Sequence, residues 1–237
     1  STFLRYLTNS SSCDVVGTVR SLSSLGDIAY EFKDQLINNV DVESDGALID
    51  VFASVRPDVV INCVGVVKQL SSSSDPLVAL PLNSLLPHRL ASICKVRGAR
   101  LIHLSTDCVF SGKGGLYTED DVPDAQDLYG VSKRLGEVNY PHTVTLRTSI
   151  IGHELNGSRS LVDWFLAQVG CVNGFDQAIY SGLPTVEIAR IIRDYVLPND
   201  DLSGLYHVSA GPITKYELLN LLAKTYQKTI QIKRSSD

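Results

Sequence analysis

Three side chains, those of Thr106, Tyr129 and Lys133, have the types and spacing needed to move a proton. Tyr129 and Lys133 are four residues apart, so on a helix they share one face, about one turn from each other. An ammonium ion beside a phenol favours the phenolate, which makes the phenol easier to deprotonate. Together with a hydroxyl at the end of a strand, this pair could pass a proton to or from a carbonyl oxygen. Such a transfer is one half of a hydride-transfer reaction.

Continuous apolar runs predict the strands that must position these groups. Residues 58–64 and 100–104 are such runs, which are typical of strands buried on both faces of a parallel sheet. Because the carboxyl ends of parallel strands share one edge of the sheet, we expect Asn62, Thr106 and Arg147 at a ligand-binding edge. Further strands are expected at 14–19, 35–42 and 143–147, and helices at 3–8, 45–56, 82–97 and from Tyr129 through Lys133.

The alternation of strands and helices predicts the α/β fold class, with a doubly wound, Rossmann-like parallel sheet in residues 1–149. After residue 149 the pattern is less regular and predicts a smaller α+β domain, residues 150–237, interleaved with the first. Its expected elements are helices near 160–168, 185–196 and 214–227 and short strands near 178–181 and 205–209.

Composition and charge narrow the range of partners. The 237 residues carry a net charge of −5 and are 44% hydrophobic, enough for a substantial core. No basic patch or run is present, so we expect no nucleic-acid partner and no anionic membrane partner. No apolar segment approaches the roughly 20 residues needed to cross a bilayer, and no signal-peptide pattern is visible.

The cysteines and histidines predict neither disulfides nor a metal site. The five cysteines are odd in number and form no C-x-x-C pair, which indicates reduced thiols and a cytoplasmic protein. The histidines are scattered without the spacing of metal ligands, so we expect no metal. They are His88, His103, His142, His153 and His207.

Several motifs together resemble the extended short-chain dehydrogenase/reductase family, and within it the dTDP-4-dehydrorhamnose reductase-like, sugar-nucleotide-binding branch. They span nearly the whole chain in the order that the family has. The motifs are P-D-V-V-I-N-C-V-G (57–65), Asn83 with Pro87, S-T-D-C-V-F-S-G (105–112), Y-G-V-S-K-R-L-G-E (129–137), L-R-T-S (146–149) and S-G-L-P-T (181–185).

The resemblance implies a role for each residue of the proton-transfer set. Thr106 would orient the substrate carbonyl, and Tyr129 would be the general acid that protonates its oxygen. Lys133 would lower the pKa of Tyr129 and hydrogen-bond the nicotinamide ribose. On the substrate side the match implies contacts from Thr106, Asp107, Cys108, Ser149 and Ser181.

The resemblance also implies a dinucleotide site, for which NADP(H) is favoured and NAD is the alternative. Arg20 follows the strand expected at 14–19, where an acidic residue would bind the ribose hydroxyls of NAD and an arginine accommodates the 2′-phosphate of NADP. Gly65 would permit close approach of the adenosine half. The implied cofactor-binding residues are Arg20, Asp41, Val42, Cys63, Val64, Gly65, Asn83, Tyr129 and Lys133.

One part of the family pattern is absent. Nothing before Ser1 supplies the first strand and the G-x-x-G-x-x-G turn that brings a pyrophosphate to a helix N-terminus. Because residues 1–7 match the helix that follows this turn, and the chain contains no methionine, we expect truncation or disorder rather than evolutionary loss.

The resulting hypothesis is an NADPH-dependent reductase, an enzyme acting on a keto group of a nucleotide-activated sugar. A sugar-nucleotide epimerase or dehydratase of the same family is one alternative; Cys108 stands where family dehydratases carry a carboxylate base. A non-catalytic NADP-binding regulatory subunit, like that of methionine adenosyltransferase, is another. Ile150 to Gly152 replace a tryptophan typical of the rhamnose enzymes, so the sugar stays open, as does a homodimer.

Overall fold

A parallel four-stranded sheet forms the centre of the computed structural model, which describes residues 2–9, 13–26, 28–68, 70–155 and 157–236. The strand order is β10-β5-β4-β3, and every neighbouring pair is parallel. This confirms the predicted α/β fold with a parallel central sheet. The strands are β3 (Val59–Asn62), β4 (Arg100–Ser105), β5 (Thr143–Thr148) and β10 (Gly204–Val208).

Helices cover both faces of this sheet, which is why successive apolar residues of a strand can both be buried. Successive residues of a strand point to opposite faces, and Leu101 and Ile102 of β4 are both fully buried. Leu101 packs in a core cluster with α3 and α5, whereas Ile102 packs in another with α8. These helices are α3 (Asp45–Val55), α5 (Leu86–Arg97) and α8 (Thr185–Ile191), the last continuing into η6 (Ile192–Val196).

The helix predicted at 82–97 is longer than expected. It begins at α4 (Pro76–Ala79) and passes through a π-helical segment, η4 (Leu80–Leu85), before α5. The segment Pro76–Arg97 has 22 residues, and an 18-residue stretch of it has a mean hydropathy of 1.2, so by length and composition alone it could cross a membrane. The expectation that no apolar segment approaches this length was therefore wrong. Of that stretch, 44% is buried inside the protein.

The N-terminal strands are shorter than predicted. Only β1 (Gly17–Thr18) and β2 (Leu36–Ile37) form, as a separate parallel pair, in place of the runs expected at 14–19 and 35–42. Nearby, α1 (Thr2–Thr8) packs against α8. The intervening elements are η1 (Leu22–Ser24), α2 (Ile28–Glu31) and η2 (Lys33–Gln35).

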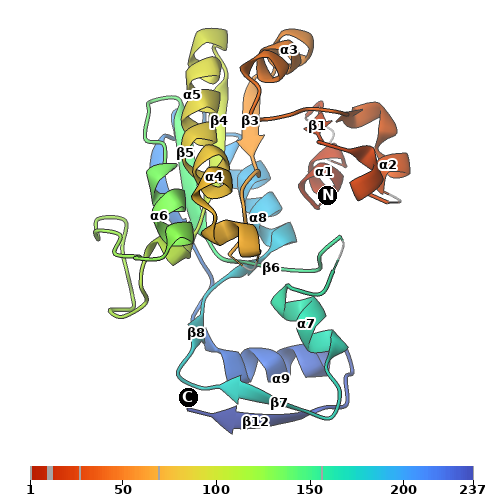
Figure 1. Cartoon of the computed structure of the whole chain (residues 1–237), viewed down its shortest axis with the longest axis vertical. Helices are drawn as coiled ribbons and strands as arrows, with labels where there is room; N and C mark the ends of the chain where they lie inside the picture. The colour runs from red at the N-terminus through yellow and green to blue at the C-terminus, as the bar shows by residue number, and fades with distance from the viewer. Residues whose placement is uncertain (1, 10–12, 27, 69, 156, 237) are drawn as a thin grey trace.

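Residues 150–237 contribute to two places in the molecule. Their β10 extends the central sheet beside β5, while a third core cluster lies at the lower end of Figure 1. That cluster joins α7 (Leu161–Ala167), β7 (Cys171–Phe175), α9 (Lys215–Thr225) and β12 (Gln231–Ser235). Short pairs connect the two places: β6 (Ile150–Ile151) with β9 (Leu183–Pro184), and β8 (Ile179–Tyr180) with β11 (Ile213–Thr214).

The remaining elements follow β3 and β4 and lie near the carboxyl edge of the sheet. They are η3 (Ser71–Ser74), η5 (Asp107–Val109) and α6 (Leu128–Leu135).

Candidate active site

The structure brings Thr106, Tyr129 and Lys133 together at the carboxyl end of β4, and we call these three residues the catalytic corner. Thr106 directly follows β4, and α6 carries the other two. A side chain at Gly130 would place its Cβ 2.5 Å from the carbonyl oxygen of Cys108. Glycine therefore lets α6 pack directly on η5, the turn that follows Thr106.

The Thr106 hydroxyl is held in place by its own turn. Thr106 Oγ1 accepts a hydrogen bond from the Cys108 backbone N–H at 3.1 Å and donates to Asp107 Oδ1 at 3.2 Å. Its side chain also lies near enough to the Tyr129 phenol to lower the pKa of that phenol. The hydroxyl is thus fixed beside the phenol, at the strand end where the sequence predicted it.

The phenol of Tyr129 is buried. Burial raises the pKa of Tyr129 to about 12; an interaction with the Thr106 side chain opposes the rise, and Cys108 and nearby carboxylates add to it. The sequence-based expectation that Lys133 lowers this pKa differs from the direction found. A spacing of four residues puts the two side chains on one face but does not reveal that the phenol is buried.

Lys133 is also buried, at 6% exposed, and its ammonium group is directed at the backbone. Lys133 Nζ donates to the carbonyl oxygen of Leu104 at 2.8 Å. Burial lowers the pKa of Lys133 to about 8, and interactions with Glu137 and Cys63 favour the charged form. The lysine therefore titrates close to neutral pH.

Asn83 links the loop after β3 to α6. Its Oδ1 accepts from the Val66 backbone N–H at 2.8 Å, and its Nδ2 donates to Ser132 Oγ at 3.1 Å. Gly65 lies against this link, because a Cβ there would be 3.1 Å from Asn83 Oδ1 and 3.8 Å from Lys133 Nζ. Asn83, predicted to bind cofactor, is fully buried and already bonded to protein groups.

Asn62, expected at the end of β3, is buried as well. Its Nδ2 lies 3.1 Å from His103 Nδ1, and its Oδ1 accepts from the Val64 backbone N–H at 3.0 Å. Burial and the nearby charge of Lys133 keep the pKa of His103 well below its usual value. Within the described ranges, no group of three or more His, Cys, Asp or Glu side chains could hold a metal ion.

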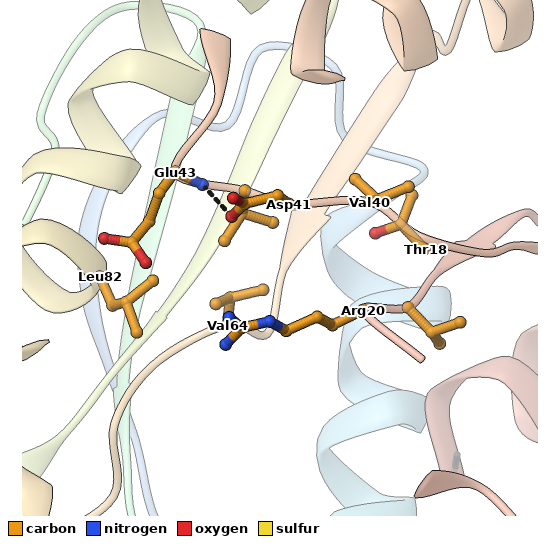
Figure 2. A pocket seen from close by; sticks show the side chains of 9 residues that line it. Thr18, Arg20, Val40, Asp41, Glu43, Val64 and Leu82 are labelled. Atoms are coloured by element: carbon orange, nitrogen blue, oxygen red, sulfur yellow. Dashed lines mark hydrogen bonds between the residues drawn. The ribbon is translucent and has the colours of Figure 1, made fainter. Parts of the chain in front are cut away.

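Four of the predicted cofactor-binding residues line a hollow of about 180 Å³, which we call the nucleotide hollow (Figure 2). Arg20 extends along one side of it, and Asp41 and Glu43 lie on the other. Glu43 was missed by the sequence analysis because it lies beyond the expected strand. The hollow is lined by Thr18, Val19, Arg20, Val40, Asp41, Val42, Glu43, Val64 and Leu82.

Cys63 and Gly65 were predicted beside Val64 but do not line the nucleotide hollow. Both lie instead near Lys133. Cys63 interacts electrostatically with the Lys133 ammonium group, and Gly65 approaches that group closely. Protein atoms around the thiol raise the pKa of Cys63 to about 11, although the residue as a whole is exposed. These two residues therefore connect the hollow to the catalytic corner.

The predicted substrate residues lie mostly at the ends of β4 and β5. Ser105 and Arg147 are paired in register, and Asp107 and Ser149 each follow two residues later. Cys108 is half-buried, and burial together with the charge of Asp107 raises the pKa of its thiol, so it is not an activated nucleophile.

Ser181 and Tyr180 come from the other side. The carbonyl oxygen of Ser181 accepts from the Ala210 backbone N–H at 2.7 Å. The pKa of its neighbour Tyr180 responds to the nearby Ser149 side chain and to the charge of Asp107. The sequence analysis did not identify Tyr180. The feature that could have indicated it is Gly182, two residues later, which leaves space for the phenol.

A buried ion pair lies at the ends of β4 and β5, next to the site. Arg147 contacts Glu137 through two hydrogen bonds of 2.8 Å, and the two side chains are 6% and 8% exposed. Ser105 Oγ donates to the same carboxylate at 2.8 Å. Arg147 also lies 5.0 Å from the ring centre of Phe110 and 3.1 Å from His207 Nε2, which ties the loop after η5 to β5 and β10.

The family model described as RmlD substrate binding domain matches residues 4–234. A dTDP-4-dehydrorhamnose reductase of Streptomyces griseus is 38% identical over 100 residues, which are 42% of this chain and 33% of the relative. The methionine adenosyltransferase 2 subunit beta of Danio rerio is 29% identical over 196 residues, 77% of this chain and 60% of the relative. The chain thus spans between a third and 60% of the length of these relatives.

Among solved structures, a dTDP-4-dehydrorhamnose reductase of Bacillus anthracis in complex with NADP superposes with a TM-score of 0.75 at 21% identity. The match covers 94% of this chain and 83% of that one. At this identity the likeness supports the fold, a Rossmann-like sheet with a smaller C-terminal part.

Proposed function

Because the chain belongs to the RmlD substrate binding domain family, we propose that the protein is an NADPH-dependent reductase of a keto group on a nucleotide-activated sugar. The observation that carries the proposal is the meeting of Thr106, Tyr129 and Lys133 at the carboxyl end of β4. A hydroxyl, a protonated phenol and a buried ammonium group are what the reduction of a carbonyl requires of its protein. The relative from Streptomyces griseus supports dTDP-4-dehydrorhamnose or a similar 4-keto sugar as substrate.

The nucleotide hollow fits the adenosine end of a dinucleotide. Val40, Val64 and Leu82 supply apolar surface for a flat base, and Arg20 supplies a guanidinium that suits a phosphate. This supports NADP(H) as the cofactor. Asp41 could instead accept hydrogen bonds from ribose hydroxyls, which keeps NAD as the alternative.

The residues of the catalytic corner would divide the proton chemistry among them. When bound, the nicotinamide supplies the hydride. The Thr106 hydroxyl, turned from Asp107 to the substrate, would donate a hydrogen bond that orients the carbonyl. Tyr129, protonated at neutral pH, would give its Oη proton to the oxygen that becomes a hydroxyl. Lys133, charged below its pKa of about 8, stabilises the phenolate that remains.

The test is an absorbance assay at 340 nm with the full-length protein, NADPH and a dTDP-4-keto-6-deoxyhexose. We expect NADPH consumption, and we expect Tyr129→Phe to lower kcat by about 10³-fold because it removes the phenol proton that is given to the carbonyl oxygen. Tyr206→Phe is the matched control, because Tyr206 lies on β10, away from the corner, and its Oη donates to the Ser203 carbonyl oxygen just before that strand. No loss of absorbance, or equal turnover by Tyr129→Phe, would overturn the proposal.

Two observations bear on the alternatives within the same fold. Cys108, with a thiol of raised pKa, stands where a dehydratase needs a carboxylate base, which disfavours dehydration. An epimerase would form product without net consumption of NADPH, so the same assay separates it from a reductase.

A regulatory subunit is the second candidate, favoured by the similarity to methionine adenosyltransferase 2 subunit beta over 77% of this chain. A regulatory subunit would bind NADPH without turnover and would co-purify with a larger catalytic partner. Retention of the complete catalytic corner supports the reductase over this reading.

We also propose a cytoplasmic location, supported by a sequence whose five cysteines are odd in number and form no C-x-x-C pair, which suits a reducing compartment. A homodimer stays a prediction, which light scattering of the full-length protein would measure.

A further inference from the structure

A second phenol, Tyr180, lies on the substrate side of the catalytic corner. It ends β8, and its ring packs against the core cluster of α7, α9 and β7. A Cβ on Gly182 would be 2.1 Å from Tyr180 Oη, 2.3 Å from Cζ, and 2.5 Å from the carbonyl oxygen of Ser149. The phenol therefore lies directly on the backbone of Gly182 and reaches the chain just after β5.

The two neighbouring strands β4 and β5 locate this hydroxyl relative to the catalytic corner. Their last paired residues are Ser105 and Arg147, and adjacent strands lie about 4.8 Å apart. Two residues beyond that pair stand Asp107 and Ser149, and Tyr180 Oη and the Ser149 carbonyl oxygen both lie against the same point of Gly182. The hydroxyl of Tyr180 thus lies over the strand end next to the one that carries Thr106.

Asp107 marks the space between the two phenols. Its negative charge acts on Tyr129 from α6 and on Tyr180 from β8, and in both cases it disfavours the phenolate. Burial adds to this effect and raises the pKa of Tyr180 to about 12. Both phenols are therefore protonated at neutral pH and can each donate one hydrogen bond.

The protonated phenol suits a sugar, because a ring hydroxyl can accept from Tyr180 and donate to Asp107 or Ser149. A phenol also brings a rigid ring with few rotatable bonds, so little conformational entropy is lost when it orders on a ligand. None of these three groups is needed for the proton transfer itself, which Thr106, Tyr129 and Lys133 complete.

We propose that Tyr180 is a substrate-binding residue that hydrogen-bonds a hydroxyl of the sugar ring. The inference rests on the proposed function and adds a residue from the C-terminal part of the chain to the site. It also explains why position 182 is a glycine, because any larger residue there would displace the phenol.

The test compares Tyr180→Phe with wild type in the NADPH assay, with a dTDP-4-keto-6-deoxyhexose as substrate. Phenylalanine keeps the ring in its core cluster and removes only the hydroxyl. We expect KM to rise about tenfold, with kcat within about threefold of wild type and with an unchanged dissociation constant for dTDP alone. Tyr206→Phe, which also removes one partly buried phenol hydroxyl, should leave KM unchanged.

Gly182→Ala provides a second variant that acts through Tyr180. We expect it to raise KM by a similar factor in the wild-type background and by less than about twofold in Tyr180→Phe. This pattern distinguishes loss of the hydroxyl contact from a general loss of packing. In the second case the increases of KM caused by Gly182→Ala and by Tyr180→Phe would multiply in the double variant.

The outcomes distinguish the inference from the proposed function. Turnover by wild type with KM of Tyr180→Phe within twofold of it would overturn the inference alone. If Tyr180→Phe unfolds below the assay temperature, binding of the dTDP-sugar is measured at a lower temperature for both single variants and the double variant. If the effects of Gly182→Ala and Tyr180→Phe on the dissociation constant then multiply, the inference is overturned as well. A wild-type protein that neither turns over nor binds the sugar nucleotide would overturn both.

Discussion

The catalytic corner and the nucleotide hollow differ in how firmly the fold holds them. Thr106 and Lys133 are 7% and 6% exposed and are bonded to the backbone of β4 and its turn. Arg20 and Asp41 are exposed and follow strands of only two paired residues. The comparison indicates that the chemistry depends on the stability of the central sheet, whereas cofactor affinity depends on a few surface charges.

The interactions that hold the side chains in place also differ between the catalytic corner and the nucleotide hollow. Under the catalytic corner, the Arg147–Glu137 pair is buried and shares its carboxylate with Ser105. In the nucleotide hollow, within the part of the chain that the structure describes, the Asp41 side chain accepts a single hydrogen bond, from the Glu43 backbone N–H to Oδ1 at 3.1 Å. A change in the first region should therefore alter stability and activity together, and a change in the second should alter affinity alone.

The largest effect is expected from Glu137→Gln, which keeps the shape of the side chain and removes its charge. The Arg147 guanidinium would then be buried without a counter-charge, which should lower the free energy of unfolding by about 3 kcal/mol. Chemical denaturation measures this loss. Turnover should fall as well, because the same pair holds the loop after η5 that borders the site.

Glu43→Gln is the matched control for this prediction, since it makes the same substitution at an exposed position of the nucleotide hollow. Its free energy of unfolding should stay within about 0.5 kcal/mol of wild type. Equal losses for the two variants would remove the distinction between the regions.

A pH effect of intermediate size is expected from Lys133, whose pKa is about 8 in the folded protein against 10.5 in the unfolded chain. Between these values the unfolded chain holds the proton that the folded protein has released. The free energy of unfolding should therefore rise with pH from about 8 upward, by at most about 1.4 kcal/mol per pH unit. Lys133→Met should lack this rise in denaturation measured between pH 7.5 and 9.

The window ends at pH 9 because the pKa values of Cys63 and Cys94 are raised to about 11 and about 12, and their stabilising contribution is lost at higher pH. Lys95→Met, at an exposed position of α5, should keep the pH dependence of wild type. If Lys133→Met retained the rise, the buried lysine would not be its source.

The sequence predicted those parts of the site that depend on short segments. The apolar runs at β3 and β4 and the strand expected at 143–147 predicted the sheet, and the Tyr129–Lys133 spacing predicted one face of α6. The spacing did not predict the direction of the Tyr129 pKa, because burial depends on chain segments distant in sequence. Tyr180 was missed for the same reason: its position depends on packing against α9 and on the space left by Gly182.

Two differences in the fold have local physical causes. Pro81 lacks a backbone donor, a usual reason to end a helix, yet a π-helical segment accommodates it and the helix starts at Pro76 instead. The strand expected near 205–209 forms as β10 but joins β5, some 60 residues earlier, in the central sheet. No pattern within a few residues specifies a partner at that distance.

The smallest effect, and the sharpest test of the comparison, is expected in the nucleotide hollow. Arg20→Ala should weaken NADPH binding about tenfold and leave NADH binding within twofold, because the guanidinium serves only the additional phosphate. Glu43→Gln should strengthen NADPH binding about twofold by removing a negative charge from the opposite side of the hollow (Figure 2). Fluorescence titration of both dinucleotides measures these changes, and added salt should diminish them, since the side chains are exposed. A loss of stability in Arg20→Ala, or equal weakening for both dinucleotides, would mean that this region is held by the fold in the way that the catalytic corner is.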